Sequence, residues 1–354
     1  MNTNKKVTVA MSGGIDSAVA ALLIKNQGYV TTGATMKLCE RLDVDGNDLS
    51  MSDIRDAKAI CDSLCIEHKV YDLTTQFHSA VIKYFIDTYL DGRTPNPCIV
   101  CNKLLKFGKL LELEKSIGTD YVATGHYANI ERDVNGRYLL KKAADSRKDQ
   151  TYMLWSLSQD QLSHSLFPLG SLTKAEIREI GAKNGFVNAH KSDSQDICFI
   201  PDGDYASFIE REIGEKYPAG KYIDEDGNIL GDHKGMIHYT IGQRKGLGIS
   251  MNKHIFVIKK DAQSNTVTLA DEDKLFTSKV VIRNINLIPF DRLDSKMRVE
   301  AKIRYSQSQS PAIAEQTAEN EITLTFSTPQ RAPAPGQSAV LYDGDYVIGG
   351  GIIQ

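Results

Sequence analysis

The chain has 354 residues, of which 41% are hydrophobic, 25% charged and 8% aromatic, and its formal net charge is −3. This length predicts two or three domain cores, and no apolar run approaches the ~18 residues of a membrane-spanning helix. The total charge gives no sign of a nucleic-acid partner. Such a partner would therefore have to bind a local basic surface. The N-terminal residues lead directly into a strand without the apolar segment of a signal peptide, which predicts a cytoplasmic protein.

The first two hundred residues alternate apolar β-branched runs with amphipathic segments. In chain order they predict a strand at Lys6–Ala10, a helix at Ser17–Asn26, a strand at Tyr29–Met36, a helix at Ser52–Leu64, a strand at His68–Tyr71 and a helix at Phe77–Leu90. This alternation is typical of a parallel sheet covered by helices on both faces. We therefore predict an α/β fold with a doubly wound parallel sheet.

The pattern continues after a proline-rich turn with a helix at Lys103–Ile117, a short strand at Tyr121–Thr124 and a hairpin at Asn129–Lys141 that turns at Asn135-Gly136. We expect the sheet to gain its last strand in this region. Thr173 followed by Glu176 has the pattern of a capping box, for a helix that runs to Lys183 and is stopped by Gly185. We expect that helix to belong to the first domain.

Beyond about residue 205 the sequence changes to short strand-like runs broken by Gly, Asp and Asn. Examples are YIDEDGNILGDH at 222–233, SNTVTLA at 264–270 and EITLTFS at 321–327. Such runs predict β-rich domains, and Lys279–Leu287 begins a new alternating stretch. We predict a catalytic α/β domain at 1–205, a small central β-rich domain at 206–275 and a β-barrel-like domain at 276–354.

A glycine-containing loop, Ser12-Gly13-Gly14-Ile15-Asp16-Ser17, joins the first predicted strand to the first helix. Backbone N–H groups and the helix dipole attract anions there, and the glycines allow close approach. The lysine of a Walker motif is lacking, and Asp16 beside a polyphosphate suggests an intervening Mg²⁺ ion. A capped tight turn is the alternative. The SGGxDS pattern resembles the PP-loop of the ATP pyrophosphatases, which implies ATP, adenylation of a carbonyl-type oxygen and release of pyrophosphate.

Six cysteines without a secretory signal favour metal-binding or catalytic thiols over a disulfide framework. Cys98 and Cys101 lie in Thr94–Asn102, which we take as an exposed turn made rigid by prolines, and Cys198 lies far along the chain. A zinc site would need a second spaced pair that the sequence lacks. Inert burial is an alternative for Cys198, and the remaining interpretation is sulfur chemistry.

The neighbours of Cys101 predict a reactive thiol. Lys103 and the N-terminus of the following helix would both favour its thiolate, which is the form that attacks a persulfide or an activated carbon. Cys61 and Cys65 lie four apart on a predicted helix face, so we predict that both pack in the core. Cys39 has no predicted role.

The motifs SGGIDS, NPCIVCN, GHYA, KDQTYML, SQDICF and YTIGQRKGLGI occur in this order. With them the chain resembles, from end to end, the bacterial tRNA-specific 2-thiouridylases of the PP-loop superfamily. The resemblance implies that Cys101 is the nucleophile and that Cys198 carries a persulfide. It implies an ATP site formed by Ala10, Met11, Ser12, Gly13, Gly14, Ile15, Asp16, Ser17, Met36 and Gly125.

The resemblance also implies tRNA, bound by its anticodon loop, as substrate. The implied tRNA contacts are Asn96, Pro97, Cys98, His126, Lys148, Asp149, Gln150, Arg304, Tyr305 and Gln337, and Asn96–Cys98 would lie against the target base. Arg244 and Lys245, among glycines, form a basic loop suited to the phosphate backbone, with a solvated charged turn as the alternative.

Position 98 departs from the family, because several members carry Asp where this chain has Cys98. An acid–base role at this position is therefore in doubt. Cys98, Cys101 and Cys198 could together ligate a [4Fe-4S] cluster with one open iron for sulfide, because thiolates are the usual cluster ligands. The alternative is persulfide chemistry between Cys198 and Cys101, which leaves a disulfide.

The implied partners are tRNA and a sulfur-donor protein, either a cysteine desulfurase or a sulfur-relay carrier, and we expect a monomer without a membrane partner. Two rival functions remain open. One is a PP-loop amide or guanidine synthetase acting on a small metabolite, which would leave the three cysteines unexplained. The other is a non-catalytic RNA-binding module with a vestigial nucleotide site, which the intact SGGIDS motif disfavours.

Overall fold

The computed structural model describes residues 4–40, 48–186, 197–249 and 253–354. Contacts divide the chain into two compact units. The first unit comprises Met1–Ile82, Cys98–Gln195 and Gly344–Ile348, and the second comprises Lys83–Pro97, Asp196–Asp343 and Gly349–Gln354. Each unit has its own buried apolar core. The threefold division at residues 205/206 and 275/276 stays a prediction.

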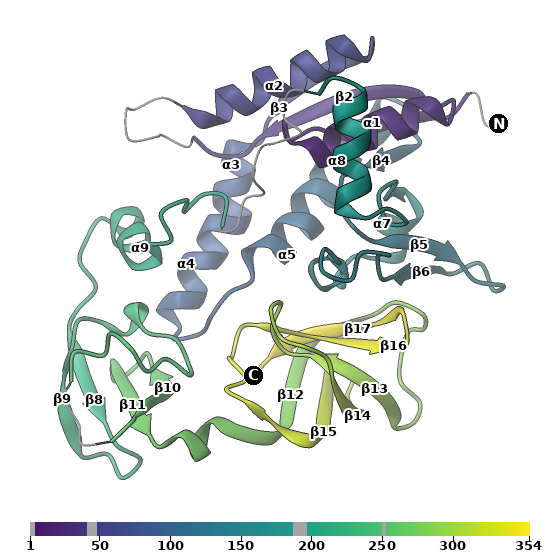
Figure 1. Cartoon of the computed structure of the whole chain (residues 1–354). Coiled ribbons are helices and arrows are strands. Elements are labelled where there is room, and N and C mark those ends of the chain that lie inside the picture. Colours follow the sequence, from purple (N-terminus) through teal and green to yellow (C-terminus); the bar gives the residue numbers. More distant parts are fainter. Residues whose placement is uncertain (1–3, 41–47, 187–196, 250–252) are drawn as a thin grey trace. The chain divides into compact units, whose positions relative to one another are not determined.

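A parallel sheet in the order β3-β2-β1-β4-β7 lies at the centre of the first unit (Figure 1). Its strands are β1 (Lys6–Ala10), β2 (Val30–Lys37), β3 (Glu67–Asp72), β4 (Tyr121–Ala123) and β7 (Ser165–Leu166). Val9 of β1 pairs with Gly33 on one side and Ala123 on the other. The strand order therefore reverses between β1 and β4, which confirms the doubly wound fold and places the ligand crevice at the carboxyl ends of these two strands.

The last strand of this sheet is β7, whose Ser165 pairs with Val122. Our expectation of a last strand between Tyr121 and Lys141 was wrong, because a two-residue strand is too short to give an alternating pattern. The predicted hairpin is confirmed as β5 (Asn129–Arg132) and β6 (Tyr138–Lys141), but it pairs with β17 through Tyr346 and lies outside the parallel sheet.

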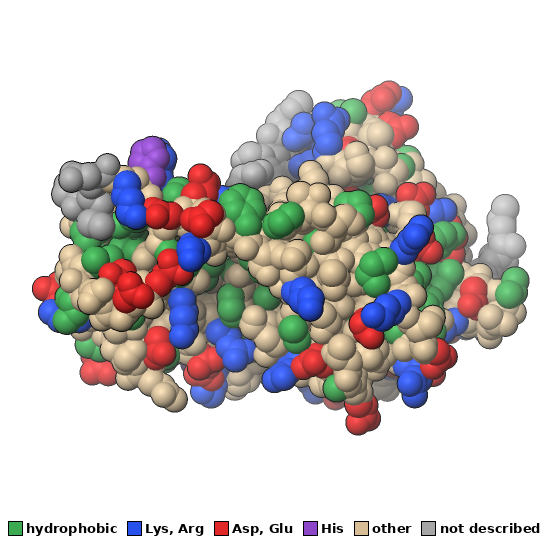
Figure 2. Space-filling model, turned by 90° about the horizontal axis from the view of Figure 1, so that it is seen from below, with side chains coloured by type: hydrophobic (Ala, Val, Ile, Leu, Met, Phe, Trp, Pro, Cys, Tyr) green, Lys and Arg blue, Asp and Glu red, His purple; other side chains and the backbone are tan. Residues whose placement is uncertain are grey.

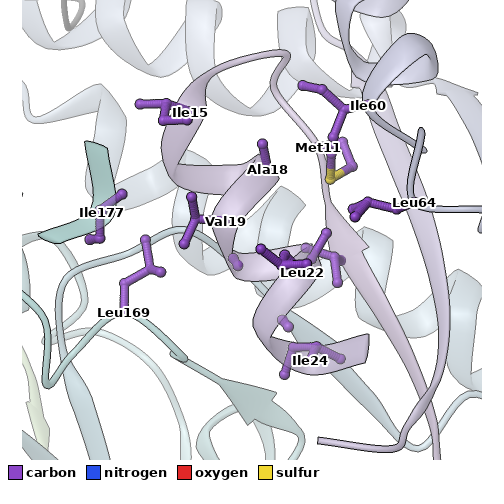
Figure 3. Close-up of a cluster of buried hydrophobic side chains, with 14 of the residues drawn as sticks. Met11, Ile15, Ala18, Val19, Leu22, Ile24, Ile60, Leu64, Leu169 and Ile177 are labelled. Atoms are coloured by element: carbon purple, nitrogen blue, oxygen red, sulfur yellow. The ribbon is translucent and has the colours of Figure 1, made fainter. Parts of the chain in front are cut away.

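Helices cover both faces of the sheet. The first face carries α1 (Ile15–Asn26), α2 (Leu49–Ser63) and α8 (Lys174–Lys183), whose apolar side chains meet in the core shown in Figure 3. Figure 1 shows α1 beside α8, and Gly181 allows this approach because a Cβ there would overlap Ile15. The opposite face packs against Leu110 and Leu111 of α6 (Leu110–Ser116).

The start and stop signals of α8 are confirmed. Thr173 Oγ1 accepts a hydrogen bond from the Glu176 N–H at 3.3 Å, and the Glu176 carboxylate accepts one from the Thr173 N–H at 2.7 Å. Gly185 follows with a left-handed φ of +69°. Ile177 lies in the core of the first unit, so the helix packs where the sequence predicted.

Two long helical segments contain π-helical turns. The first runs through α3 (Thr74–Phe77), a π-helical turn at His78–Ile82 and α4 (Lys83–Leu90). The second runs through α5 (Pro97–Cys101), a π-helical segment at Asn102–Lys109 and α6. Helix therefore begins at Pro97, a residue suited to the first helical position. Cys98 and Cys101 lie on this helix. Our interpretation of Thr94–Asn102 as one exposed turn was therefore wrong from Pro97 onward.

The second unit contains a sheet in the order β10-β11-β8-β9. Its strands are β8 (Gly220–Ile223), β9 (Ile229–His233), β10 (Phe256–Asp261) and β11 (Thr266–Ala270). Helix α9 (Tyr205–Ile213) was not predicted; Asp204 caps it by accepting from the Ser207 N–H at 3.1 Å. In the first unit, the short helix α7 (Gln159–Ser163) was also missed.

Six strands in the described part of the chain close into a barrel through pairing of β12 with β17. They are β12 (Phe276–Leu287), β13 (Met297–Lys302), β14 (Ser310–Ala318), β15 (Glu321–Arg331), β16 (Ser338–Asp343) and β17 (Tyr346–Ile353). The β-barrel-like fold predicted for the C-terminal region is therefore confirmed.

No described helix is both long and apolar enough to cross a membrane. On the face of the molecule that Figure 2 shows, Lys and Arg side chains are interspersed with Asp and Glu side chains. A polyanion bound to that face would therefore meet both signs of charge.

Candidate nucleotide and thiol sites

The SGGxDS loop connects β1 to α1 at the reversal of strand order. Gly13 has a φ of +75°, and α1 begins after Gly14 without a side-chain cap. Ser17 Oγ donates to the Gly14 carbonyl at 2.9 Å and lies 3.3 Å from Ser12 Oγ. An uncapped helix N-terminus beside two hydroxyl groups fits a phosphate group.

Gly13→Ala is expected to weaken ATP binding about tenfold or more. The left-handed backbone costs a non-glycine residue about 1–2 kcal/mol, and a Cβ at this position would lie 2.7 Å from the Asp53 carbonyl oxygen. Gly28→Ala is the matched control, because Gly28 has a φ of +85° with nothing within 4 Å of a Cβ. Isothermal titration with ATP and thermal melts would measure both variants. Equal ATP affinity in both would contradict the steric argument.

Asp16 is held by two residues from other elements. The Lys174 ammonium donates to both carboxylate oxygens at 2.8 and 2.9 Å, and the Tyr127 hydroxyl donates at 2.8 Å. Lys174 is 7% exposed. In this structure Lys174 therefore offsets the charge of the Asp16 carboxylate.

The other residues predicted for the ATP site lie at the carboxyl ends of β1, β2 and β4. A Cβ on Gly125 would lie 2.9 Å from both the Asp16 carbonyl carbon and the Ser17 nitrogen, so this glycine closely contacts the phosphate loop. Met36 and Ala10 pack together against the α6 face of the sheet. The structure thus brings the members of this predicted group together.

The sequence motifs did not indicate Lys174 or Tyr127 as partners of Asp16. Lys174 is the first residue of α8, where the helix dipole disfavours a cation. A lysine directly after a capping residue was therefore the one signal in the sequence that could have indicated a carboxylate partner.

The two thiols on the helix that begins at Pro97 differ in exposure. Cys101 is 8% exposed, whereas Cys98 is exposed. Desolvation raises the pKa of the Cys101 thiol to about 11, and it raises the pKa of Cys98 as well. Our expectation of a Cys101 thiolate is therefore wrong for this state of the protein, because removal from water disfavours the charged form.

Lys106, and not Lys103, is the cation that acts on these thiols. Lys106 lowers the pKa of both Cys98 and Cys101 against the larger effect of desolvation, and Lys103 is exposed. In an α-helix, a side chain five positions after Cys101 would point to a different side of the helix. The hydrogen bonds of a π-helix run from i to i+5 and bring Lys106 to the same side as Cys101. Sequence periodicity could not show this shift.

Alkylation of Cys101 by iodoacetamide is expected to accelerate about tenfold for each pH unit between about pH 7.5 and 9.5, because only the thiolate reacts. The sign follows from the raised pKa of about 11, below which the thiol stays mostly protonated. Mass spectrometry of the modified peptide would measure the rate, with the exposed Cys65 as reference for reagent loss. A rate that levels off near pH 8 would instead indicate a stabilised thiolate.

His126 lies directly after Gly125 and packs against the rings of Phe107 and Phe167 at centroid distances of 5.7 and 6.0 Å. Its Nδ1 lies 2.7 Å from the Thr124 hydroxyl. Desolvation, with a smaller contribution from Lys106, lowers the pKa of His126 well below its usual value. A neutral imidazole at this place can donate or accept a hydrogen bond but adds no charge.

The predicted tRNA contacts at 148–150 adjoin the His126 segment. Gln150 exchanges hydrogen bonds with the Tyr127 backbone at 2.9 and 3.0 Å. Asp149 accepts from the Ala143 N–H at 2.9 Å and the Thr151 hydroxyl at 2.6 Å. Asp149 and Gln150 therefore hold the loop in place, and Lys148 next to them is partly exposed.

The remaining predicted residues lie in the second unit. The Arg304 guanidinium donates to the Ile241 and Ala332 carbonyls at 3.2 and 2.6 Å, and Tyr305 is 41% exposed. Gln337 donates to backbone carbonyls near Pro95. Arg244 lines a cavity of about 520 Å³ with Lys253 and His254, whereas Lys245 is exposed.

The thiols outside the helix at Pro97 have different surroundings. Cys198 is exposed, while Ser194–Asp196 of the SQDICF motif lie outside the described residues. Cys61 is buried in the core as predicted, but Cys65 is exposed. The prediction for Cys65 was wrong because α2 ends at Ser63 and Cys65 adopts a φ of +50°. Within the described ranges, no three His, Cys, Asp or Glu side chains are grouped to hold a metal ion.

A doubly wound sheet with an SGGxDS loop at its reversal point defines a nucleotide-binding domain of the PP-loop ATP pyrophosphatase class. Three family models match successive parts of the chain. They are the "tRNA methyl transferase HUP domain" over residues 5–202, the "tRNA methyl transferase PRC-barrel domain" over 206–271 and the "Aminomethyltransferase beta-barrel domain" over 277–353.

Curated relatives match over the full length. The tRNA-specific 2-thiouridylase MnmA of Clostridioides difficile (strain 630) is 48% identical, covering 100% of this chain and 99% of that protein. The enzyme of the same name from Acetivibrio thermocellus is 47% identical, with 99% of this chain and 100% of that protein covered. The chain belongs to the family of tRNA-specific 2-thiouridylases.

Solved structures are more remote. A 4-thiouridine synthetase in complex with RNA and bound ATP is 16% identical, with a TM-score of 0.37, over 59% of this chain and 50% of that one.

The family implies ATP and Mg²⁺ as cofactors. The uncapped N-terminus of α1 and the paired hydroxyls of Ser12 and Ser17 fit a polyphosphate. Asp16 is the carboxylate of this loop, a ligand type that Mg²⁺ prefers, although Lys174 engages it in this structure. When bound, Mg²⁺ would neutralise phosphate charge.

Proposed function

We propose that this protein is an ATP-dependent tRNA 2-thiouridylase. It transfers sulfur to carbon 2 of the wobble uridine and forms 2-thiouridine, AMP and pyrophosphate. The observation that carries this proposal is the 48% identity to a tRNA-specific 2-thiouridylase across all of this chain and 99% of that protein. The phosphate loop and the Cys101 helix supply the groups that such a reaction needs.

The first stage is adenylation of the base. ATP occupies the SGGxDS loop, where N–H groups at the start of α1 and the hydroxyls of Ser12 and Ser17 bind its phosphates. O2 of a uracil flipped out of the anticodon loop attacks the α-phosphorus, and pyrophosphate leaves. This step turns O2 into part of a leaving group. The proposed tRNA contacts are Asn96–Cys98, His126, Lys148–Gln150, Arg304, Tyr305 and Gln337.

The second stage is sulfur transfer. The terminal sulfur of a Cys198 persulfide attacks C2, and AMP leaves with the former O2. Cys101 then attacks the Cys198 sulfur and breaks the S–S bond, so the thiocarbonyl stays on the base and a Cys101–Cys198 disulfide forms. A two-electron reductant reopens the disulfide. Because burial keeps Cys101 protonated, this step requires loss of its proton.

Cys98, Cys101 and Cys198 are also the residues that would hold an iron–sulfur cluster, since thiolates are its usual ligands. Such a cluster would supply an open iron for sulfide in place of the Cys198 persulfide. We further propose a cytoplasmic monomer that receives its sulfur from a cysteine desulfurase or a sulfur-relay carrier.

The test is to incubate the protein with unmodified tRNA transcript, ATP, Mg²⁺ and a persulfide source. Nucleoside mass spectrometry should then show 2-thiouridine, with one AMP and one pyrophosphate released for each sulfur transferred. Pyrophosphate release that depends on a small metabolite, without thionucleoside, would indicate an amide or guanidine synthetase. Binding of tRNA without AMP formation would indicate a non-catalytic module.

A further inference from the structure

The three residues that precede Pro97 form no helix or strand, yet other elements of the second unit hold their backbone. The Thr94 N–H donates to the Pro335 carbonyl at 2.8 Å. The backbone of Asn96 hydrogen-bonds the Tyr84 side chain of α4. Pro95 has no N–H to donate. The N–H groups of this segment are therefore paired with residues from two separate elements.

Gln337, in the turn between β15 and β16, binds the carbonyl groups of the same segment. Its Nε2 donates to the Thr94 oxygen at 3.2 Å and to the Pro95 oxygen at 3.0 Å. Both partners only accept, so the amide nitrogen has to face them. The Gln337 backbone is itself fixed, because its N–H donates to the Ala334 carbonyl at 3.1 Å and its carbonyl accepts from the Ile353 N–H at 2.8 Å.

Gly336 brings this turn close to the segment. Its φ is +91°, and a Cβ there would lie 2.8 Å from the Thr94 oxygen, 3.0 Å from the Thr94 nitrogen and 3.0 Å from the Arg93 Cβ. Real Cβ atoms rarely approach backbone this closely. The turn and the segment therefore lie so close together that position 336 requires glycine.

We propose that the barrel turn Ala334–Gln337 is a clamp that positions Thr94–Asn96, and through Pro97 the start of α5, for the target base, with Gln337 as its positioning residue. The inference rests on the proposed function, in which Asn96–Cys98 faces that base. The clamp gives Gln337 a positioning role in addition to the proposed tRNA contact. Both of its N–H groups are directed at protein carbonyls, so only its Oε1 remains to meet RNA.

The test replaces Gln337 by leucine, which keeps the size and removes both donors. A misplaced substrate-contacting segment slows a reaction more than it weakens binding of the whole tRNA. The expected result is a fall in kcat for 2-thiouridine formation of about tenfold or more, with the KM for tRNA within about twofold. Hydrogen–deuterium exchange should show at least about tenfold faster exchange of the Thr94 and Asn96 amides.

Two controls separate the clamp from general effects on the barrel. Gln316→Leu removes another barrel glutamine, whose side chain accepts from the Leu293 N–H at 2.8 Å and donates to the Glu319 carbonyl at 2.9 Å. Gly336→Ala should reproduce the Gln337→Leu result, whereas Gly344→Ala, with a φ of +55° and nothing within 4 Å of a Cβ, should not.

An increase in KM for tRNA at unchanged kcat, with amide exchange as in the unmodified protein, would overturn the clamp and favour direct RNA contact. Should the unmodified protein make no thionucleoside, the proposed function fails, and amide exchange alone still decides the clamp. Unchanged exchange in both Gln337→Leu and Gly336→Ala would overturn it whatever the activity, whereas faster exchange in both would support it.

Discussion

Replacing Cys101 or Cys198 by serine is expected to lower the rate of 2-thiouridine formation by roughly 10³-fold or more. When groups act as one catalytic unit, removing one of them costs about as much rate as removing all of them. Serine cannot carry or resolve a persulfide. Serine is nearly as large as cysteine, so neither the buried Cys101 nor the exposed Cys198 leaves a large cavity when it is replaced. Nucleoside mass spectrometry of tRNA from single-turnover reactions would measure the loss.

Cys65→Ser is the matched control for these variants, because Cys65 is also exposed and lies outside α2. It should thiolate tRNA at the rate of the unmodified protein. AMP formation by the Cys101→Ser and Cys198→Ser variants would show whether adenylation still occurs without sulfur transfer. Normal thiolation by either variant would contradict the thiol mechanism.

Lys174→Met is expected to reduce tRNA-dependent pyrophosphate release about 10²-fold, a typical cost of removing one electrostatic group from a catalytic site. Lys174 binds both oxygens of Asp16 at 2.8 and 2.9 Å. Its loss leaves a carboxylate without its cation beside the ATP phosphates, which it would repel. A pyrophosphate-release assay at saturating and limiting ATP would separate weaker binding from slower chemistry.

Lys183→Met is the control for Lys174, because Lys183 lies at the other end of α8 in an exposed ion pair with Glu179, and such pairs contribute about 0–1 kcal/mol. The double variant Asp16→Asn/Lys174→Met would show whether the two groups act together. If Lys174→Met alone releases pyrophosphate at the normal rate, Lys174 has only a structural role.

In the first unit, local sequence signals predicted a strand, a helix start or a turn correctly where the residues that signal it lie within that one element. β1 was predicted at the residues it occupies, Lys6–Ala10, because alternating apolar residues end at a glycine loop. The Thr173–Glu176 capping box and the Asn135-Gly136 turn were also correct. In each case the residues that determine the geometry lie within a few positions of each other.

The missed features depend on contacts or small shifts that local patterns do not encode. The π-helical segment at Asn102–Lys109 moves the hydrogen-bond partner by one residue and leaves the apolar pattern nearly unchanged. The hydrogen bond from Gln337 to Thr94 joins residues 243 positions apart. The pKa of Cys101 depends on burial, which the fold as a whole determines.

The division of the chain has a consequence for protein synthesis. Gly344–Ile348 belongs to the first unit, although the preceding segment of that unit ends at Gln195. Domains usually fold as they leave the ribosome, N-terminal region first. The nucleotide-binding unit of this protein, however, lacks one of its segments until Gly344–Ile348 has been synthesised. Nascent chains stalled before that segment should therefore resist proteolysis less than the released protein does, and truncation before Gly344 should damage an ATP site encoded hundreds of residues earlier.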